Sequence, residues 1–374
     1  MPETILTTPL DTWHREHGAR MVPFAGYSMP VQYDFAGAMA ERCKGGVMAE
    51  HLYCREKAAL FDVSHMGQAM LHGAGAAGLL EHLVCGDISG LRPGRQRYTL
   101  LTTESGGILD DLMVANLGEE GLFLVVNASR KAVDFAHIGT VTPVTVLTDR
   151  ALLALQGPAA AGIMARLAPA AAALPFMGVA RCDIAGVPGL VSRSGYTGED
   201  GFEMSVPGEM AVTLANRLLE QPDLIPAGLG ARDSLRLEAG LCLYGNDIGE
   251  TTSPIEAGLT WAISKRRKMS WDFLGGPAIR AHLDNGPPRR RVGIRPDGRA
   301  PAREHTVILT PDGQELIGEI TSGGFGPTLN GPMAMGYVRN DFSDDGSKLS
   351  LMVRGKPLPA TVVPLPFVPH RYVR

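Results

Sequence analysis

Two adjacent aspartates, Asp110 and Asp111, offer the clearest chemistry in this sequence. They lie in an apolar, strand-like run, Ile108–Val114. Side chains in a strand alternate between faces, so Asp110 shares one face with Leu112 and Asp111 shares the other with Met113. Because both faces are apolar, at least one carboxylate must be paired or have a raised pKa, as acid–base groups often do. A turn-proximal aspartate that caps backbone amides explains the run equally well, and periodicity does not choose between the two acids.

Glu203 is a second carboxylate in a strand-like run. Phe202, Met204 and Val206 share one face of that run, whereas Glu203 and Ser205 share the other. Taken alone, this pattern makes Glu203 most simply a solvated strand residue.

Arg232 and Arg236 are the basic residues whose spacing suggests a site. They lie four residues apart in a helix-like run, which places them on one face. Two interpretations remain open, a salt-bridge network with Asp233 and Glu238 or a site for an anion or carboxylate. The spacing alone favours the network.

Other patterns argue against nucleotide and metal sites. Gly73–Gly78 matches G-x-G-x-x-G, but no acidic residue stands about 20 positions later, where a dinucleotide fold requires one. His14 and His17 have no third ligand nearby, and the five cysteines lie far apart with no C-x-x-C pair. We therefore expect no metal site.

Length and composition bound the class of protein. The chain has 374 residues, of which 45% are apolar and 20% charged, so it folds and has room for two or three domains. A net charge of −4 argues against a nucleic-acid partner. The most apolar stretch, 151–180, is interrupted by prolines and arginine, so no membrane span is expected. No targeting segment is visible, and the unpaired cysteines favour a cytoplasmic protein.

The elements that must position these residues are mixed in type in the first part of the chain. Strands are expected at residues 67–71, 97–102, 108–117, 122–126, 187–192 and 201–206, with two more between 141 and 155. Helices are expected within 36–57 and at 78–84, 210–219 and 230–239, and an Ala-rich helix after Gly157-Pro158.

The last part of the chain contains only strand-like runs. They are expected at 291–294, 306–309, 316–320, 333–338, 349–353 and 358–363. Asn285–Pro288 is the best linker candidate. The sequence thus predicts a region of mixed helices and strands, α+β or α/β, over 1–284 and an all-β domain over 285–374.

Several motifs together resemble one family, the aminomethyltransferases or T proteins of the glycine cleavage system. They occur in family order over almost the whole chain, and the run from Gly195 to Glu203 is the most specific. The matching runs are Phe24–Tyr33, Phe61–Gly67, Gly106–Leu112, Asn127–Ser129, Ala154–Pro158, Ser192–Glu203, Pro226–Asp233, Leu243–Gly245, Ser253-Pro254, Ile320–Gly323 and Pro327.

The resemblance implies a fold and a reaction. The fold is an α+β, three-lobed cloverleaf around a central cavity, with two interleaved lobes over 1–284 and a small C-terminal β-barrel over 285–374. The reaction transfers a one-carbon unit from the aminomethyl-lipoyl arm of the H protein to tetrahydrofolate. It releases ammonia and gives methylenetetrahydrofolate. The implied partners are therefore the lipoylated H protein and folate, with no metal.

The resemblance also implies roles for particular residues. Asp111 would be the catalytic carboxylate, and Glu203 would hold the polar edge of the pterin. The cavity would be lined by Met66, Tyr98, Val126, Asn127, Tyr196 and Arg232. The sequence departs from the family at Ala115, where an aromatic residue is common, and in the 27 residues between Tyr33 and Phe61, which are more than expected.

Two rival functions belong to the same superfamily: a folate-dependent demethylase and a folate-binding accessory protein without transferase activity. The intact Asp110-Asp111 pair and the Gly195–Glu203 run argue against both. Two basic runs, Lys265–Lys268 and Arg289–Arg291, add a hypothesis about the partner. They would attract an acidic lipoyl carrier through complementary charge, although solvated linkers also carry such runs.

Overall fold

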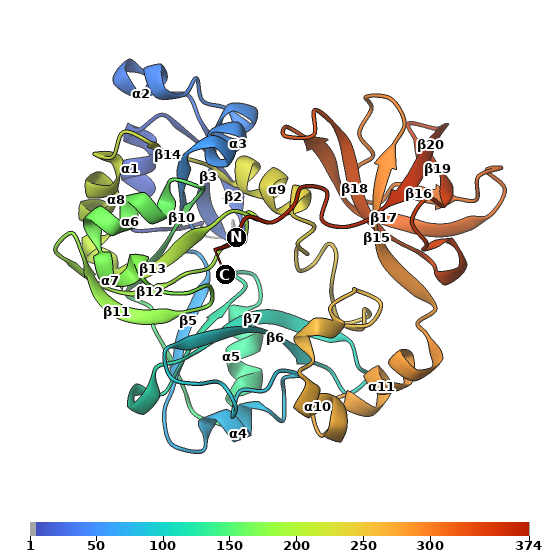
Figure 1. Ribbon diagram of the computed structural model, residues 1–374, viewed down its shortest axis with the longest axis horizontal. Helices are drawn as coiled ribbons and strands as arrows, with labels where there is room; N and C mark the ends of the chain where they lie inside the picture. Colours follow the sequence, from blue (N-terminus) through green and yellow to red (C-terminus); the bar gives the residue numbers. More distant parts are fainter. Residues whose placement is uncertain (1–4, 374) are drawn as a thin grey trace.

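The computed structural model describes residues 5–373, which form three lobes around a common centre (Figure 1). Two lobes mix helices and sheets, and the third is a closed β-barrel. The α+β class and the cloverleaf arrangement are confirmed. We keep the domain boundary at 284/285 as a proposal, because helix α11 (Gly276–Asn285) ends there and the first barrel strand begins at Arg289.

The first lobe is built on a six-stranded sheet with the order β11-β12-β13-β10-β4-β14. Its strands are β4 (Ala58–Asp62), β10 (Arg150–Gln156), β11 (Val179–Ile184), β12 (Val187–Ser192), β13 (Gly201–Pro207) and β14 (Leu224–Pro226). Alternation sorts its apolar residues. Leu153 and Leu155 enter one buried cluster, whereas Leu152 and Ala154 enter another on the opposite face.

Helices cover both faces of this sheet. The first cluster packs against residues of α1 (Asp11–Glu16), α6 (Ala160–Leu167), α7 (Pro169–Ala172) and α8 (Ala211–Leu219). The second packs against α3 (Val47–Glu56) and α9 (Leu229–Glu238). Helix α9 faces the barrel as well, since Leu237 packs on Met333 and Met335.

The segment between Tyr33 and Phe61 folds into two helices, α2 (Gly37–Arg42) and α3, as expected. It follows a small sheet of β1 (Leu6–Thr7), β2 (Ala19–Phe24) and β3 (Tyr27–Tyr33). Arg42 donates to the carbonyls of Leu219, Gln221 and Leu224 at 3.0–3.2 Å. The long segment therefore supplies hydrogen-bond donors to backbone carbonyls at and beyond the C-terminal end of α8.

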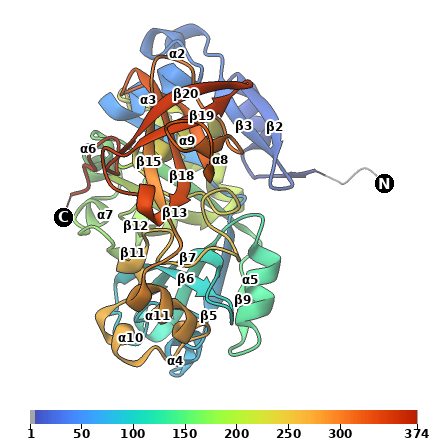
Figure 2. The same ribbon diagram turned by 90° about the vertical axis from the view of Figure 1, so that its right-hand side faces the viewer.

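The second lobe holds a five-stranded sheet with the order β6-β7-β8-β5-β9. Its strands are β5 (Gly67–Leu71), β6 (Arg95–Thr102), β7 (Ile108–Asn116), β8 (Leu122–Val126) and β9 (Val144–Val146). Figure 2 shows α5 (Lys131–Ile138) beside this sheet, with α10 (Lys265–Ser270) and α11 on the other side of the lobe. Gly67 lets α5 approach, because a Cβ there would lie 2.6 Å from that of Lys131.

The third lobe is a barrel with the closed order β15-β18-β17-β16-β19-β20. Its strands are β15 (Arg289–Pro296), β16 (Val307–Leu309), β17 (Leu316–Gly326), β18 (Gly331–Arg339), β19 (Lys348–Val353) and β20 (Lys356–Val363). All six runs predicted from sequence are strands. Closure leaves no free sheet edge.

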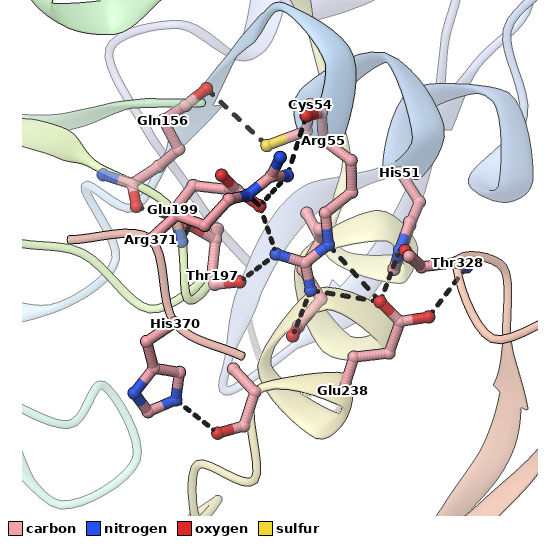
Figure 3. A network of polar contacts seen from close by, with 12 residues as sticks. His51, Cys54, Arg55, Gln156, Thr197, Glu199, Glu238, Thr328, His370 and Arg371 are labelled. Carbon is pink, nitrogen blue, oxygen red and sulfur yellow. Dashed lines mark hydrogen bonds and ion pairs between the residues drawn. The ribbon is translucent and has the colours of Figure 1, made fainter. Parts of the chain in front are cut away.

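A charge network, buried except at Arg371, joins the first lobe to the barrel and to the C-terminal segment (Figure 3). The Arg55 guanidinium donates to Glu199 at 2.7 Å and to Glu238 at 3.1 Å. Glu238 accepts the backbone N–H of Thr328, in the β17–β18 turn, at 2.8 Å. Arg371, beyond the barrel, donates to Glu199 and, at 2.8 Å, to the carbonyl of Arg55. We call these five residues the interlobe network.

We expect Arg55→Met to lower the free energy of unfolding by about 3 kcal/mol, because it removes one of the two cations that pair with the buried Glu199 and leaves the buried Glu238 with His51 as its only basic partner within the described residues. Denaturant titration measures this change. Arg217→Met is the matched control. It removes an exposed pair with Glu220 and should change the free energy by less than about 0.5 kcal/mol. Equal effects of the two variants would show that the network does not stabilise the fold.

Two features of the fold differ from the sequence-based expectations. The helix predicted at 78–84 is α4 (Ala76–Leu80), which begins earlier and ends sooner. Beyond its end, the Glu81 carboxylate accepts the N–H groups of Ile88 and Ser89, so the chain after α4 forms a turn around this side chain. The sequence-based expectations also missed several elements, namely strands β1–β4, β11 and β14 and helices α1, α5, α10 and α11. Within residues 5–373, no helix is both long and apolar enough to span a membrane.

Candidate active site

Asp110 and Asp111 point to opposite faces of β7, as the alternation predicts. Asp110 is fully buried with Leu112, whereas Asp111 is partly exposed, as is Met113. Strand β6 pairs with β7, so Tyr98 lies opposite Met113 on the face of Asp111. The Tyr98 hydroxyl donates a hydrogen bond to the Asp111 carboxylate.

Asn127 connects the two acids from the end of β8. Its Nδ2 donates to Asp111 Oδ1 at 2.7 Å and to Asp110 Oδ1 at 2.9 Å. The backbone N–H of Asn127 also donates to Asp110 at 3.3 Å. One amide therefore fixes the relative position of two carboxylates that face opposite ways.

The surroundings of Asp111 raise its pKa to about 7. Burial of the carboxylate is the main cause, and the nearby charge of Asp110 adds to it. The hydrogen bonds from Asn127 and Tyr98 favour the charged form and limit the rise. A carboxyl group with this pKa can exchange a proton near neutral pH, as a general acid or base must.

Glu203 is half-buried on β13, so the solvated interpretation is wrong. Ser194 donates to its Oε2 at 2.8 Å. Glu203 faces a small cavity between the two sheets, together with Gln96, Met113, Phe123 and Ser192. The sequence pattern could not show this, because the covering face belongs to β7 and β8 of the other lobe.

Arg232 and Arg236 share a helix face but differ in their partners. Arg236 pairs with Asp233 at 2.8 Å, as the network interpretation predicts, but its second acid is Asp247, also at 2.8 Å, and it bonds to Ser322. Glu238, the other predicted partner, pairs with Arg55 instead. Arg232 instead lies over the Tyr196 ring at 4.7 Å. Its Nη1 is buried and has no hydrogen-bond partner within residues 5–373. Burial lowers the pKa of Arg232, against the opposing charge of Glu203.

The remaining predicted lining residues fall into two groups. Tyr98, Asn127 and Tyr196 lie around Asp111, and the Tyr196 hydroxyl donates to the carbonyl of Cys242. Met66 is partly exposed beside the cluster under α3 and α9.

Val126 requires a correction. Its side chain is fully buried in the core of the second lobe, among Leu112, Val114 and Leu124. A side-chain contact between Val126 and a ligand is therefore wrong, and only its main chain remains available.

Sequence reasoning missed two residues near Asp111. Trp261 is 63% exposed and stacks on Tyr98 with ring centroids 5.2 Å apart. Asp134, on α5, is fully buried and contacts Asp110. A signal for Asp134 existed, since it lies one helical turn before Ile138, an apolar residue on the same helix face.

The fold and the site are those of a group-transfer enzyme: three lobes, a C-terminal barrel, and Asp111, a carboxylate whose pKa is raised into the neutral range. Residues 10–267 match the GCVT N-terminal domain family, and residues 289–369 match the glycine cleavage T-protein C-terminal barrel domain. The chain belongs to this family, the aminomethyltransferases or glycine cleavage T proteins.

Similar proteins cover nearly the whole chain. Mitochondrial aminomethyltransferases of Mesembryanthemum crystallinum and Gallus gallus are 45% and 46% identical to it, over 98% and 99% of this chain and 90% and 94% of theirs. The crystal structure of glycine cleavage system aminomethyltransferase T from Bartonella henselae is 41% identical. That likeness covers 99% of this chain and 100% of the other, with a TM-score of 0.90.

Proposed function

We propose that this aminomethyltransferase moves the one-carbon unit from the aminomethyl-lipoyl arm of an H protein to tetrahydrofolate. Ammonia leaves, and the products are methylenetetrahydrofolate and a dihydrolipoyl arm. The observation that carries this proposal is Asp111, a carboxylate with a pKa near 7 held between a hydroxyl and an amide donor.

Asp111 acts at the folate amine that attacks the carbon. The amine is weakly basic, and a fixed carboxylate orients it and stabilises the positive charge that develops on nitrogen. Asp111 does this in its ionised form, so its hydrogen bonds to Asn127 and Tyr98 hold a charge that burial would otherwise suppress. Over the whole reaction two folate nitrogen–carbon bonds form, and the bonds from the same carbon to the ammonia nitrogen and to the lipoyl sulfur break. The two protons lost from the folate nitrogens leave on ammonia and on the lipoyl thiol.

Glu203 and Arg232 serve the polar parts of the folate. Glu203 has accepting capacity beyond its bond from Ser194, and a carboxylate accepts two N–H donors of a pterin at once. The unpartnered Nη1 of Arg232 offers a donor to a substrate oxygen. Glu203 thus provides a hydrogen-bond acceptor, and Arg232 a donor, for the folate.

The test is an assay of ammonia release from aminomethylated H protein, with and without tetrahydrofolate. We expect release that depends on folate and is lost in Asp111→Asn. Demethylation of a small amine or sulfonium compound, without activity on H protein, would favour the demethylase. Folate binding without either reaction would favour the accessory protein.

The hypothesis that the two basic runs attract the H protein needs a correction, because most of their arginines have partners within the fold. Arg267 is buried and bonds to Asp272 at 2.6 Å, and Arg266 pairs with Asp87 at 2.8 Å. Arg289 pairs with Glu256, and Arg291 donates to the carbonyl of Ala257. These four arginines are engaged within the fold. Arg290, between Arg289 and Arg291, is exposed, and within residues 5–373 its side chain bonds only to Asn340, at 2.6 Å.

On α10, Lys265 and Lys268 make no ion pair within the described residues. The same segment exposes Met269, at 74%, and Trp261 beside the site. We propose that this surface receives the H protein, with the two lysines steering it and the apolar side chains contacting it.

We expect Lys265→Glu combined with Lys268→Glu to raise the KM for H protein and to weaken its dependence on salt. The turnover number at saturating H protein and the affinity for free tetrahydrofolate should stay near wild type. Steady-state kinetics at two ionic strengths measures both. A wild-type KM that does not change with salt would rule out the steering role.

We place the reaction in the cytoplasm as a further proposal. All five cysteines are free thiols, as expected in a reducing compartment. Immunodetection in fractionated source cells tests this, and enrichment in an organelle fraction would contradict it.

A further inference from the structure

Asp134 is a buried carboxyl group that the reaction scheme does not use. It lies on α5 with no exposed surface. Neither of its oxygens accepts a hydrogen bond from any group within residues 5–373. Ionising a carboxyl group in such a place costs a large free energy, because no polar group replaces the hydrogen bonds to water that it has lost.

The nearest polar neighbour of Asp134 is another carboxyl group. Asp110 is also fully buried, and the two side chains are within hydrogen-bonding contact. Two carboxylates can bond to each other only when one of them carries a proton. Asp110 already accepts from the side chain and backbone of Asn127, so it is the better place for the negative charge.

The charge of Arg130 lowers the pKa of Asp134, but the two side chains make no ion pair within the described residues. Arg130 lies over the Tyr244 ring at 5.3 Å and pairs with Glu250 at 3.0 Å. Asp111 is a further negative charge on the other face of β7. The described residues contain no group of three or more side chains arranged to hold a metal ion. A proton is therefore what balances this cluster.

We propose that Asp134 is a positioning residue that stays protonated at neutral pH and donates its proton in a hydrogen bond to Asp110. Asp110 thereby remains ionised beside Asp111. The charge of Asp110 raises the pKa of Asp111, so Asp134 helps to set the pH at which Asp111 becomes active. The pKa of Asp134 itself is raised, mainly by burial and further by Asp110. Only the kinetic consequence rests on the proposed function.

The protonation state can be measured without any activity. We expect the infrared spectrum of the wild-type protein at pH 8 to contain the carbonyl stretch of a protonated carboxylic acid. Asp134→Asn should remove that band, whereas Asp284→Asn, which changes an exposed acid, should leave it. A wild-type spectrum without the band would overturn the proposal, whatever the enzyme turns over.

Thermal unfolding gives a second measurement. Asp134 has a higher pKa in the folded than in the unfolded chain, so the folded state binds more protons above about pH 4. Its contribution to stability therefore falls as pH rises. We expect Asp134→Asn to have the same Tm as wild type at pH 4 and a higher Tm at pH 8. Equal Tm differences at both values would contradict the proposal.

The pH profile of kcat/KM tests the effect on Asp111. Asparagine mimics the neutral acid and still donates to Asp110, so Asp134→Asn should keep the acid limb of the profile within about half a unit. Asp134→Val removes the donor, leaves Asp110 with an unshared charge, and should move the limb upward by about one unit. A downward shift in Asp134→Asn would show that Asp134 is ionised. If Asp134→Val folds and the acid limb of the profile does not move, Asp134 has only a packing role.

Discussion

Asp111→Asn should lower turnover by at least about tenfold while the protein stays folded, because the side chains are nearly isosteric and only the charge is lost. The neutral amide cannot stabilise the positive charge that develops on the attacking nitrogen. Single-turnover release of ammonia measures this step. In the wild type, kcat/KM should also rise with pH through about 7, where Asp111 ionises.

Asp110→Asn is the control on the same strand. It removes the charge that raises the pKa of Asp111, so we expect the acid limb to move to lower pH with a smaller loss of turnover. If Asp110→Asn loses more activity than Asp111→Asn, the assignment of the two acids is reversed.

Glu203→Ala should weaken tetrahydrofolate binding by about tenfold or more, the effect of leaving N–H donors without their acceptor at about 1–3 kcal/mol. Isothermal titration calorimetry measures the affinity directly. Ser194→Ala is the matched control. It removes the hydroxyl that donates to Glu203 but leaves the carboxylate, so it should weaken binding less. Unchanged affinity in Glu203→Ala would place the folate elsewhere.

Relations that depend on local backbone geometry could be predicted from the sequence, whereas relations between distant segments could not. Strand alternation alone places Asp110 and Asp111 on opposite faces of β7, because that relation depends only on local backbone geometry. The six barrel strands could be predicted for the same reason, because each depends on the pattern of its own short run. Helical periodicity likewise places Arg232 and Arg236 on one face.

Relations between distant segments could not be predicted in this way. Arg232 and Arg236 have different partners because the barrel and Asp247 reach only one of them. Glu203 is half-buried because a sheet from another lobe covers it. The contact of Asp134 with Asp110 depends on how α5 packs on its sheet, and the resemblance to known enzymes did not supply it either.

The interlobe network sets an order of events during synthesis. Arg371 bonds to the carbonyl of Arg55, a residue 316 positions earlier. At ribosomal speeds this separation corresponds to roughly 15–60 seconds. Glu199 emerges in between, so Arg55 and Glu199 can pair long before their third partner exists. Glu199 therefore has only one of its two cations until the barrel has been made and the segment beyond it returns. Chaperones have that interval in which to act on the first lobe.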